Sequence, residues 1–367
     1  MAEVVLEHVS KKFGEVEAVK DVCFTCSDKE FIVLLGPSGC GKTTSLRMIA
    51  GLESVDEGNI YIDGRIVNDL SPQNRNIAMA FETYALYPSL SVYDNIGFPL
   101  RIKGRPSREI RKEVTNFAEF VSVSDILDKW PHNLTDGQKQ KVSLARALIK
   151  KPSVFLLDEP ISHVGEEERE ELRSMLKRIH KEVGGTFVYV THNQIEAISL
   201  ADRIAVFNLG VLQQMASPSE LFNRPANRFV ASFVGEPPIN IIACSLVESQ
   251  GSFFLQSESF QIEISKEIGK AVLNEGAFQL QIGLRPWDID TYRSRTPGYS
   301  LCGELLDCKS VSGESLLKVK VGKEILTVLI EGEFSIAESR KKANLWLSFD
   351  ECKMHIFDGR SGRLILS

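Results

Sequence analysis

The first two thirds of the chain alternate uninterrupted apolar runs with amphipathic stretches. Apolar residues follow one another at 31–35, at 154–157 and, between two threonines, within 186–191, and this pattern predicts strands buried on both faces. Helices are predicted at about 138–150 and at 166–182, a segment rich in Glu, Arg, Lys and Leu. Strands and helices in alternation are typical of an α/β domain.

The pattern changes after Gly235-Glu-Pro-Pro238, a segment that interrupts regular structure. Short alternating stretches follow, and they predict strands at 260–264, 278–284, 316–321 and 325–330. Strands at this density without helices are typical of a small barrel or sandwich. Because 367 residues exceed one typical domain, we expect two, at residues 1–235 and 236–367.

Charge and sorting signals narrow the classes of function. The chain has 43 basic and 49 acidic residues, and the resulting net charge of −6 argues against nucleic acid as a bulk partner. Its first residues do not resemble a signal peptide, and no apolar run approaches about 18 residues. We therefore expect a cytoplasmic protein that reaches a membrane only through a partner.

The seven cysteines are expected to be reduced and structural. Cys23 and Cys26 form a C-x-x-C within a strand-like stretch, where residues three apart face opposite sides. No second C-x-x-C completes a zinc site, so metal binding is not expected there.

A phosphate-binding loop is predicted at Gly36-Pro-Ser-Gly-Cys-Gly41-Lys42-Thr43, which matches G-x-x-x-x-G-K-[ST] between a predicted strand and a helix. Glycines let backbone N–H groups turn around phosphates, and a helix N-terminus adds positive potential. Lys42 is expected to bridge the β- and γ-phosphates, and Thr43 to place its hydroxyl on Mg²⁺. The residues expected to bind the nucleotide are Ser38, Gly39, Cys40, Gly41, Lys42, Thr43 and Thr44.

A second half of the site is predicted where the apolar run 154–157 ends in Asp158 and Glu159. In α/β sheets, ligands bind at the C-terminal ends of the strands. Asp158 is expected to hold Mg²⁺, directly or through water, and Glu159 to act on the attacking water as general base.

Further motifs resemble those of the ABC transporter ATPase family. Leu134-Thr-Asp-Gly-Gln138 is similar to its signature loop, His192 to its switch histidine, and Phe81-Glu82 with the following residues to its Q-loop. Phe13 is similar to the aromatic residue that stacks on adenine. The segments 201–204, 223–227 and 235–240 resemble the branch that imports maltose and glycerol phosphate, and Gly283-Leu-Arg-Pro286 resembles the OB-like (TOBE-type) regulatory domain of that branch.

The resemblance implies an ATP hydrolase that uses ATP and Mg²⁺ and works as a dimer. Each phosphate loop would face the signature of the other subunit, so that Thr135, Asp136, Gly137 and Gln138 act on the partner's ATP. His192 and Glu82 would join Glu159 in catalysis. The metal ligands would be Thr43, Glu82 and Asp158.

The resemblance also implies the partners. A helical subdomain at about residues 84–133 would pass motion to two transmembrane permease subunits, with Tyr84 to Pro88 as the contact. The chain would lie at the cytoplasmic face of the cell membrane, and an extracytoplasmic binding protein would deliver the cargo. Sugars, polyols or glycerol phosphate are expected, and polyamines and iron stay possible.

Four positions depart from the family pattern: Glu82 in the Q-loop, Asp136 in the signature, Gly165 where the D-loop has an aspartate, and Asn193 after the switch histidine. Asp136 and Gly165 would act on the partner's ATP, which suggests a heterodimer with one impaired site. A homodimer that tolerates these changes is the alternative. A subunit that binds nucleotide but hydrolyses it poorly is a second reading of the function.

Two other points stay open from the sequence. A soluble DNA-repair or translation ATPase is a third class, disfavoured because neither a long coiled coil nor a second cassette is present. The C-terminal domain is expected to serve dimerisation rather than to sense an effector, with Trp287, beside Arg285, in its core.

Overall fold

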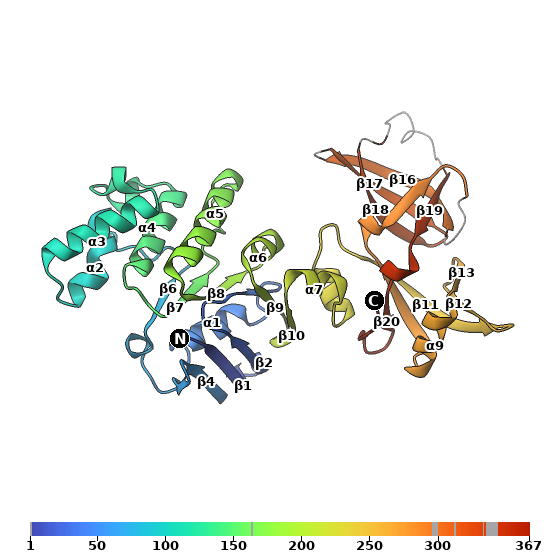
Figure 1. Ribbon diagram of the computed structural model, residues 1–367, viewed down its shortest axis with the longest axis horizontal. Helices are drawn as coiled ribbons and strands as arrows, with labels where there is room; N and C mark the ends of the chain where they lie inside the picture. The colour runs from blue at the N-terminus through green and yellow to red at the C-terminus, as the bar shows by residue number, and fades with distance from the viewer. Residues whose placement is uncertain (1, 163, 296–299, 312, 333, 335–343) are drawn as a thin grey trace. The chain divides into compact units, whose positions relative to one another are not determined.

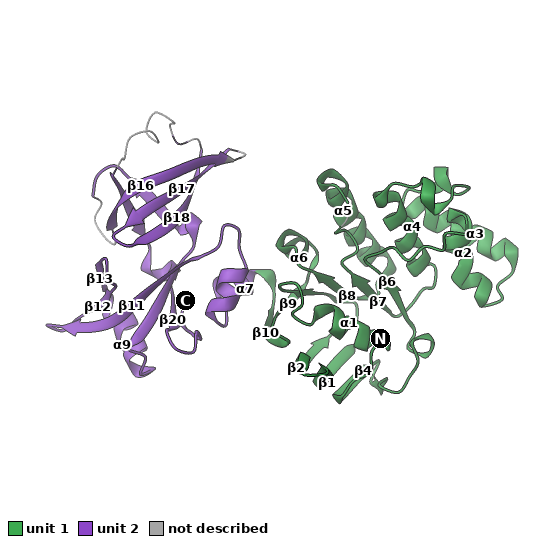
Figure 2. Ribbon diagram, turned by 180° about the vertical axis from the view of Figure 1, so that it is seen from behind, with its two compact units in different colours: residues 1–218 green, residues 219–367 purple. Residues whose placement is uncertain are grey.

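The computed structural model describes residues 2–162, 164–295, 300–311, 313–332, 334 and 344–367. These residues form two compact units, residues 1–218 and 219–367 (Figure 2). Each unit has its own apolar core and is described by itself.

A six-stranded sheet forms the centre of unit 1, with the strand order β10-β9-β3-β8-β7-β6. All neighbouring pairs are parallel except β10 with β9. Every residue of β3, β7 and β8 is buried, because the helices and a second sheet cover both faces. The strands are β3 (Phe31–Leu35), β6 (Ile77–Ala80), β7 (Val154–Asp158), β8 (Thr186–Thr191), β9 (Arg203–Asn208) and β10 (Val211–Ala216).

The second sheet of unit 1 is antiparallel, with the order β2-β1-β4-β5. Helices α2, α3 and α4 group together at one end of the unit (Figure 1). The strands are β1 (Val4–Phe13), β2 (Val16–Cys26), β4 (Glu57–Ile62) and β5 (Arg65–Ile66). The helices are α1 (Lys42–Ala50), α2 (Val92–Ile102), α3 (Ser107–Phe120), α4 (Asp136–Leu148), α5 (Glu166–Val183) and α6 (Gln194–Leu200), with 3-10 turns at Pro72–Asn74, Ser124–Ile126 and Pro131–Asn133.

The α/β pattern predicted for this part of the chain is confirmed. The strands at 31–35 and 186–191 have the predicted bounds, and the strand predicted at 154–157 extends by one residue to Asp158. The predicted helix at 166–182 is α5, whereas the one predicted from about 138 begins at Asp136. Within the described residues, no helix combines the length and apolar character needed to cross a membrane.

Unit 2 contains two antiparallel sheets, with the orders β13-β12-β11-β14-β20-β21 and β15-β19-β16-β17-β18. The first sheet has β11 (Asn240–Ser249), β12 (Ser252–Gln256), β13 (Gln261–Ile264), β14 (Gln279–Leu284), β20 (His355–Asp358) and β21 (Leu364–Leu366). The second has β15 (Ile289–Tyr292), β16 (Ser300–Val311), β17 (Glu314–Val321), β18 (Glu324–Glu331) and β19 (Asn344–Phe349). This confirms the predicted C-terminal β domain, whose two sheets are consistent with an OB-like fold. The prediction that Trp287 lies in its core is wrong, because Trp287 is 40% exposed.

The expectation of strands without helices is wrong for one segment of the β domain. Helix α9 (Lys266–Asn274) lies between β13 and β14, and the Ser265 hydroxyl caps it by accepting from the backbone N–H of Ile268. Gly269 of α9 packs so closely on Phe253 that a Cβ there would lie 2.2 Å from the ring. The helix contacts β11, β12 and β21 and buries Val272.

Helices α7 (Pro218–Asn223) and α8 (Arg228–Phe233) precede these sheets, and the contact boundary at residue 218 places them, apart from Pro218 itself, in unit 2. Arg285, which follows β14 and is buried, connects this helical segment to the β domain. Its guanidinium donates to the carbonyl groups of Ala231, Val234 and Phe222 at 2.9, 2.6 and 3.2 Å. The boundary drawn from the sequence at residue 235 lies after these helices, so the contacts divide the chain earlier.

Candidate functional site

The predicted phosphate loop connects β3 to α1. Gly39 and Gly41 have positive φ angles of 76° and 103°. A Cβ at Gly41 would lie 2.3 Å from the carbonyl oxygen of Ala18, so conformation and space both require glycine. No side chain caps α1, and its first N–H groups can therefore face an anion.

The Lys42 ammonium group is held inside this loop. It is buried, and Nζ donates to the carbonyl oxygens of Gly36 and Pro37 at 2.9 and 2.8 Å. Within the described residues no carboxylate forms an ion pair with it, so a buried cation rests on neutral carbonyl groups. An anionic phosphate fits this arrangement, because a buried charge is stable only with strong partners.

Thr43 and Asp158 meet at the ends of α1 and β7. Thr43 Oγ1 donates to Asp158 Oδ1 at 2.9 Å. Burial raises the pKa of Asp158; the Thr43 hydrogen bond opposes this, and the carboxylates of Glu159 and Glu82 raise the pKa further. A divalent cation would relieve this crowding of carboxylates, and hydroxyl and carboxylate oxygens are ligands that Mg²⁺ prefers.

Glu159 follows directly and has a positive φ of 42°. Its backbone N–H donates to the carbonyl group of Val190 at 3.0 Å, which fixes it against β8. Its Oε2 lies 2.9 Å from Nδ1 of His192, at the end of β8. Parallel pairing of β7 with β8 therefore brings the two predicted catalytic residues together, although they are distant in sequence.

The predicted signature residues form the first turn of α4. Thr135 Oγ1 accepts from the Gln138 N–H and Gln138 Oε1 accepts from the Thr135 N–H, both at 3.2 Å, which is a capping box. Asp136 is exposed (54% of its side chain) and forms an ion pair with Lys139 at 2.9 Å. Gly137 is buried, and a Cβ there would lie 2.9 Å from the carboxyl group of Glu168.

The loop after Glu82 is attached to the same helix. Tyr84 and Ala85 both have positive φ angles, 61° and 47°. The Tyr84 carbonyl accepts from Ser143 Oγ at 3.0 Å and from Arg146 Nη2 at 3.0 Å, and the Ala85 carbonyl accepts from Arg146 Nη1 at 2.7 Å. Roles for Ser143 and Arg146 were not predicted from the sequence, although their polar side chains on an otherwise buried helical face were the available signal.

The D-loop segment and the residue after the switch histidine have local structural roles. The carbonyl group of Ser162 accepts from Arg169 Nη2 at 2.9 Å, and Gly165 precedes α5 without a side-chain cap. His163 lies outside the described residues. Asn193 caps α6, because its Oδ1 accepts from the N–H of Glu196 at 3.1 Å.

Phe13 ends β1, on the antiparallel sheet of unit 1. Its ring is exposed (47%), and the Lys11 ammonium group lies 5.4 Å from the ring centroid. An exposed aromatic ring beside a cation can receive a flat ligand such as a nucleobase.

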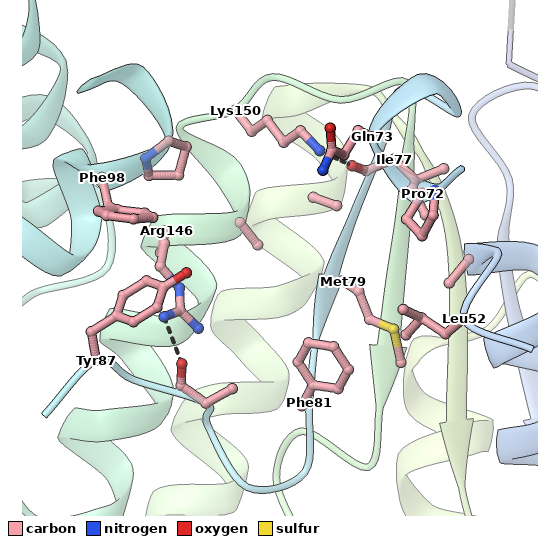
Figure 3. A pocket seen from close by; sticks show the side chains of 15 residues that line it. Leu52, Pro72, Gln73, Ile77, Met79, Phe81, Tyr87, Phe98, Arg146 and Lys150 are labelled. Carbon is pink, nitrogen blue, oxygen red and sulfur yellow. Dashed lines mark hydrogen bonds between the residues drawn. The ribbon is translucent and has the colours of Figure 1, made fainter. Parts of the chain in front are cut away.

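A groove of about 340 Å³ lies between β6, the loop at 81–87 and helices α2 and α4 (Figure 3). The rings of Tyr87 and Phe98 are tilted by 46° with centroids 4.5 Å apart, and the Arg146 guanidinium lies 5.3 Å from the centre of the Tyr87 ring. Met79 and Phe81 add apolar surface. The groove is therefore largely apolar, and the Arg146 guanidinium gives it a positive charge. The same side chain connects the groove to the Q-loop through its hydrogen bonds.

The C-x-x-C motif places its sulfur atoms on opposite faces, as predicted: Cys23 is exposed and Cys26 is buried. Burial raises the pKa of Cys26 well above its usual value. Pairing of β1 with β2 instead brings Cys23 near His8 and Asp21, with their potential ligand atoms within 4.8 Å of one another. The sequence analysis missed this exposed cluster, because only strand register brings its members together.

Comparison with known proteins establishes the family. The ABC transporter family profile matches residues 19–162. The chain is 41% identical to the trehalose/maltose import ATP-binding protein MalK of Thermococcus litoralis over 380 residues, which cover 100% of both chains. The chain belongs to the ABC transporter family.

Other relatives and a solved structure support the same family assignment. This ABC ATPase is 44% identical over 289 residues to the osmoprotective compounds uptake ATP-binding protein GgtA of Synechocystis sp., with 79% of the chain and 78% of GgtA covered. It is 36% identical over 363 residues to the sn-glycerol-3-phosphate import ATP-binding protein UgpC of Cereibacter sphaeroides, with 99% of each covered. A dimeric post-hydrolysis structure of the ATP-binding cassette MJ0796, bound to ADP and Pi, matches with a TM-score of 0.54 at 31% identity, and covers 58% of this chain and 98% of that one.

The expected P-loop fold and family resemblance are thereby confirmed. As an ABC transporter ATPase, the chain binds and hydrolyses ATP.

Proposed function

We propose that this chain is the ATP-binding subunit that energises an importer of sugars, polyols or glycerol phosphate. The likeness to MalK and UgpC, both named as import ATP-binding proteins, carries the proposal because it spans 100% and 99% of the chain. Transporters of many different cargoes share an ATPase domain, so the likeness of the second unit to these relatives is what narrows the class of cargo. The name of GgtA adds osmoprotective compounds to this range.

In this proposal the phosphate loop and α1 hold the nucleotide. The N–H groups of Ser38 to Thr44 and the Lys42 ammonium group bind phosphate oxygens, and Phe13 stacks on the adenine. Thr43, Asp158 and Glu82 hold Mg²⁺. Bound Mg²⁺ supplies positive charge that stabilises the charge developing on the phosphates during hydrolysis.

Glu159 is the proposed general base, and His192 positions it. The carboxylate takes the proton of the attacking water, while the contact of 2.9 Å with His192 fixes the orientation of its Oε2. The positive φ of Glu159 turns its side chain at the end of β7, beside Asp158.

The substitution Glu159→Gln tests this against the alternative of a subunit that binds ATP but hydrolyses it poorly. We expect hydrolysis by the purified chain and cargo uptake by the transporter to fall at least about a hundredfold, because the base is lost while the shape is kept. Glu166→Gln, an exposed glutamate at the start of α5, is the control. Uptake that survives Glu159→Gln would favour the alternative.

Membrane partners are proposed to dock at the groove of Figure 3, which includes part of the segment Tyr84 to Pro88. Two transmembrane permease subunits would contact it and hold the chain at the cytoplasmic face of the membrane. A substrate-binding protein on the other side would deliver the cargo. Apolar surface around Tyr87 and Phe98 supports a protein contact there.

The second ATPase subunit of the transporter is either a different chain, which gives a heterodimer, or a second copy of this one, which gives a homodimer. Gly165 lacks the D-loop aspartate, and Asp136 brings a carboxylate toward the partner's ATP, which favours a heterodimer with one impaired site. The ion pair of Asp136 with Lys139 balances that charge and favours a homodimer. Native mass spectrometry of the complex purified through a tag on this chain decides between one copy and two.

A further inference from the structure

Two buried polar side chains, Thr191 and Glu196, lie on either side of His192 in the sequence. Thr191 ends β8 and is 2% exposed, and Glu196 lies in the first turn of α6 and is 3% exposed. Neither residue has a role in the mechanism proposed above. Polar groups buried so deeply cost stability unless hydrogen bonds satisfy them, so their hydrogen bonds indicate what they do.

The Glu196 carboxyl group accepts two hydroxyl hydrogen bonds on one oxygen. Thr191 Oγ1 donates to Oε2 at 2.7 Å, and the Tyr189 hydroxyl donates to the same atom at 2.8 Å. Burial raises the pKa of Tyr189 well above its usual value, so this hydroxyl keeps its proton. Among the described residues no cation forms an ion pair with Glu196. The carboxyl group therefore holds the two hydroxyl groups firmly, because the bonds are short and lie in the low-dielectric interior.

The Thr191 hydroxyl passes this constraint to the backbone on the other side of His192. A hydroxyl has one proton, and Thr191 gives it to Glu196, so the lone pairs of Oγ1 are left to accept. Oγ1 accepts from the backbone N–H of Asn193 at 3.0 Å. The Asn193 Oδ1 in turn accepts from the N–H of Glu196 at 3.1 Å. These three bonds close a network of Thr191, Asn193 and Glu196 that includes the residues on both sides of His192.

The His192 imidazole depends on this network for its position. Its side chain is 53% exposed, and among the described residues it is in hydrogen-bond contact only with Glu159, whose Oε2 lies 2.9 Å from Nδ1. Glu159 is itself attached to β8, because its N–H donates to the carbonyl group of Val190. The distance between the imidazole and the carboxylate therefore depends on the backbone at the end of β8, which the network fixes.

We propose that Thr191 and Glu196 are positioning residues for ATP hydrolysis. Glu196 holds the Thr191 hydroxyl, and this hydroxyl holds the Asn193 N–H. The segment between them then keeps His192 in contact with Glu159. The inference rests on the roles proposed above for His192 and Glu159, and it adds the residues that keep the two together. Neither positioning residue contacts the nucleotide, so both act on turnover and not on binding.

Thr191→Val in the full-length chain tests the proposal, because it removes the hydroxyl and keeps the shape of the side chain. We expect kcat of ATP hydrolysis to fall about tenfold, since small displacements of catalytic groups are costly, while KM for MgATP stays within about twofold. Thr191→Ser keeps the hydroxyl and should retain most of the wild-type kcat.

The matched control is Thr186→Val, at the start of the same strand. Thr186 is also fully buried, and its hydroxyl oxygen also accepts from a backbone N–H, that of Lys29 at 2.9 Å. This change should cost similar stability in thermal unfolding without loss of kcat. Circular dichroism verifies that each variant is folded.

The same substitution in a His192→Ala background shows whether Thr191 acts through His192. Residues that act independently have additive effects on the activation free energy, whereas residues that act through one another do not. We therefore expect Thr191→Val to lower kcat by less than about twofold once His192 is replaced. Radiolabelled ATP makes the slow residual turnover of this variant measurable.

Glu196 is tested by two variants of its own. Glu196→Leu removes the oxygen that accepts from Thr191 and should reproduce the loss of kcat in Thr191→Val. Glu196→Gln keeps an acceptor oxygen and should lose less. Full kcat in Glu196→Leu would overturn the part of the proposal that concerns this residue.

The proposal is overturned if Thr191→Val loses no more kcat than Thr186→Val, or if it loses as much in the His192→Ala background as without it. A Thr191→Ser variant as slow as Thr191→Val would show that packing, and not the hydroxyl, is what matters. If His192→Ala leaves kcat unchanged, the proposed role of His192 is wrong and this inference fails with it. A loss in His192→Ala without one in Thr191→Val overturns the inference alone.

Discussion

At the scale of single residues, the phosphate loop depends on close backbone packing and on buried charged side chains. Gly41 approaches the carbonyl oxygen of Ala18 so closely that no side chain fits, while Gly39, with a positive φ of 76°, has open space around it. Lys42 and Asp158 are buried, and the partners that they have are neutral groups of the loop and of α1: the Gly36 carbonyl for Lys42 and the Thr43 hydroxyl for Asp158. Small changes here act directly on nucleotide binding.

Gly41→Ala should destabilise the loop more than Gly39→Ala. Both place a Cβ at positive φ, which costs about 1 kcal/mol, but only the first adds a clash with backbone. We expect Gly41→Ala to abolish binding of a fluorescent ATP analogue and Gly39→Ala to weaken it modestly. Equal effects would show that φ, and not space, sets the requirement.

His355 gives stability a pH dependence with a definite sign. Its pKa is lowered from 6.5 to about 4 in the folded chain, chiefly by burial. Below about pH 6.5 the unfolded chain therefore binds more protons, and stability is lost as the pH falls toward 4. Between pH 7 and pH 5 the free energy of unfolding should fall by about 2 kcal/mol because of this histidine.

Urea unfolding at the two pH values measures this, with His355→Gln as the non-titrating comparison. The variant should lack this part of the pH dependence. Parallel pH profiles of the two proteins would contradict the expectation.

At the scale of elements, α4 connects two loops. Its first turn holds the capping box of Thr135 and Gln138, and its middle binds the Q-loop carbonyls through Ser143 and Arg146. The cap orders the N–H groups at the start of the helix, and ordered N–H groups are what a bound phosphate would require. Helix α4 therefore connects the signature residues to the Q-loop in addition to packing in the unit.

Thr135→Ala should cost about 1 kcal/mol of stability, the usual value of a cap, and should also reduce ATP hydrolysis. Thr135→Ser keeps the hydroxyl and should preserve both. Ser265→Ala removes the corresponding cap of α9 in unit 2 and should cost similar stability without loss of hydrolysis. Thermal unfolding and a phosphate-release assay measure the two effects.

The sequence predicted elements with strong local signals and missed those that depend on packing. An uninterrupted apolar run defined β3 to the residue, an apolar run between two threonines defined β8, and the glycine-rich motif placed Lys42 and Thr43. Helix α9 was missed because nine residues between strands carry too little periodicity. Bonds from Arg146 to the Q-loop and the neighbourhood of His355 and Arg285 arise only from tertiary contacts, which no spacing in the chain reveals.

At the scale of the whole chain, α7 and α8 belong with the β domain. Arg285 holds the carbonyl groups of Phe222, Ala231 and Val234, all of which precede residue 236. A domain cut at the Pro-rich segment would leave a buried guanidinium without these acceptors. We therefore expect α7 and α8 to unfold together with the β domain.

Two fragments test this. Residues 219–367 should fold when expressed alone, whereas residues 236–367 should be less stable by at least about 3 kcal/mol, because charged hydrogen bonds are lost from a buried group. Chemical unfolding followed by circular dichroism compares them. Equal stability of the fragments would return the boundary to residue 235.

The attachment of the Q-loop to α4 has a consequence for a paired ATPase. One end of this linkage, Glu82, lies near Asp158 in the chain's own site, and the other, Thr135 to Gln138, would face the site of the partner. Under the proposed roles, a shift of the Q-loop on ligation at the first site would be passed to the donors at the second, and thermodynamic linkage would require the reverse effect to be equally large. Two such chains would bind ATP cooperatively even without contact between their nucleotides, and a weakened Arg146 bond would make the sites independent.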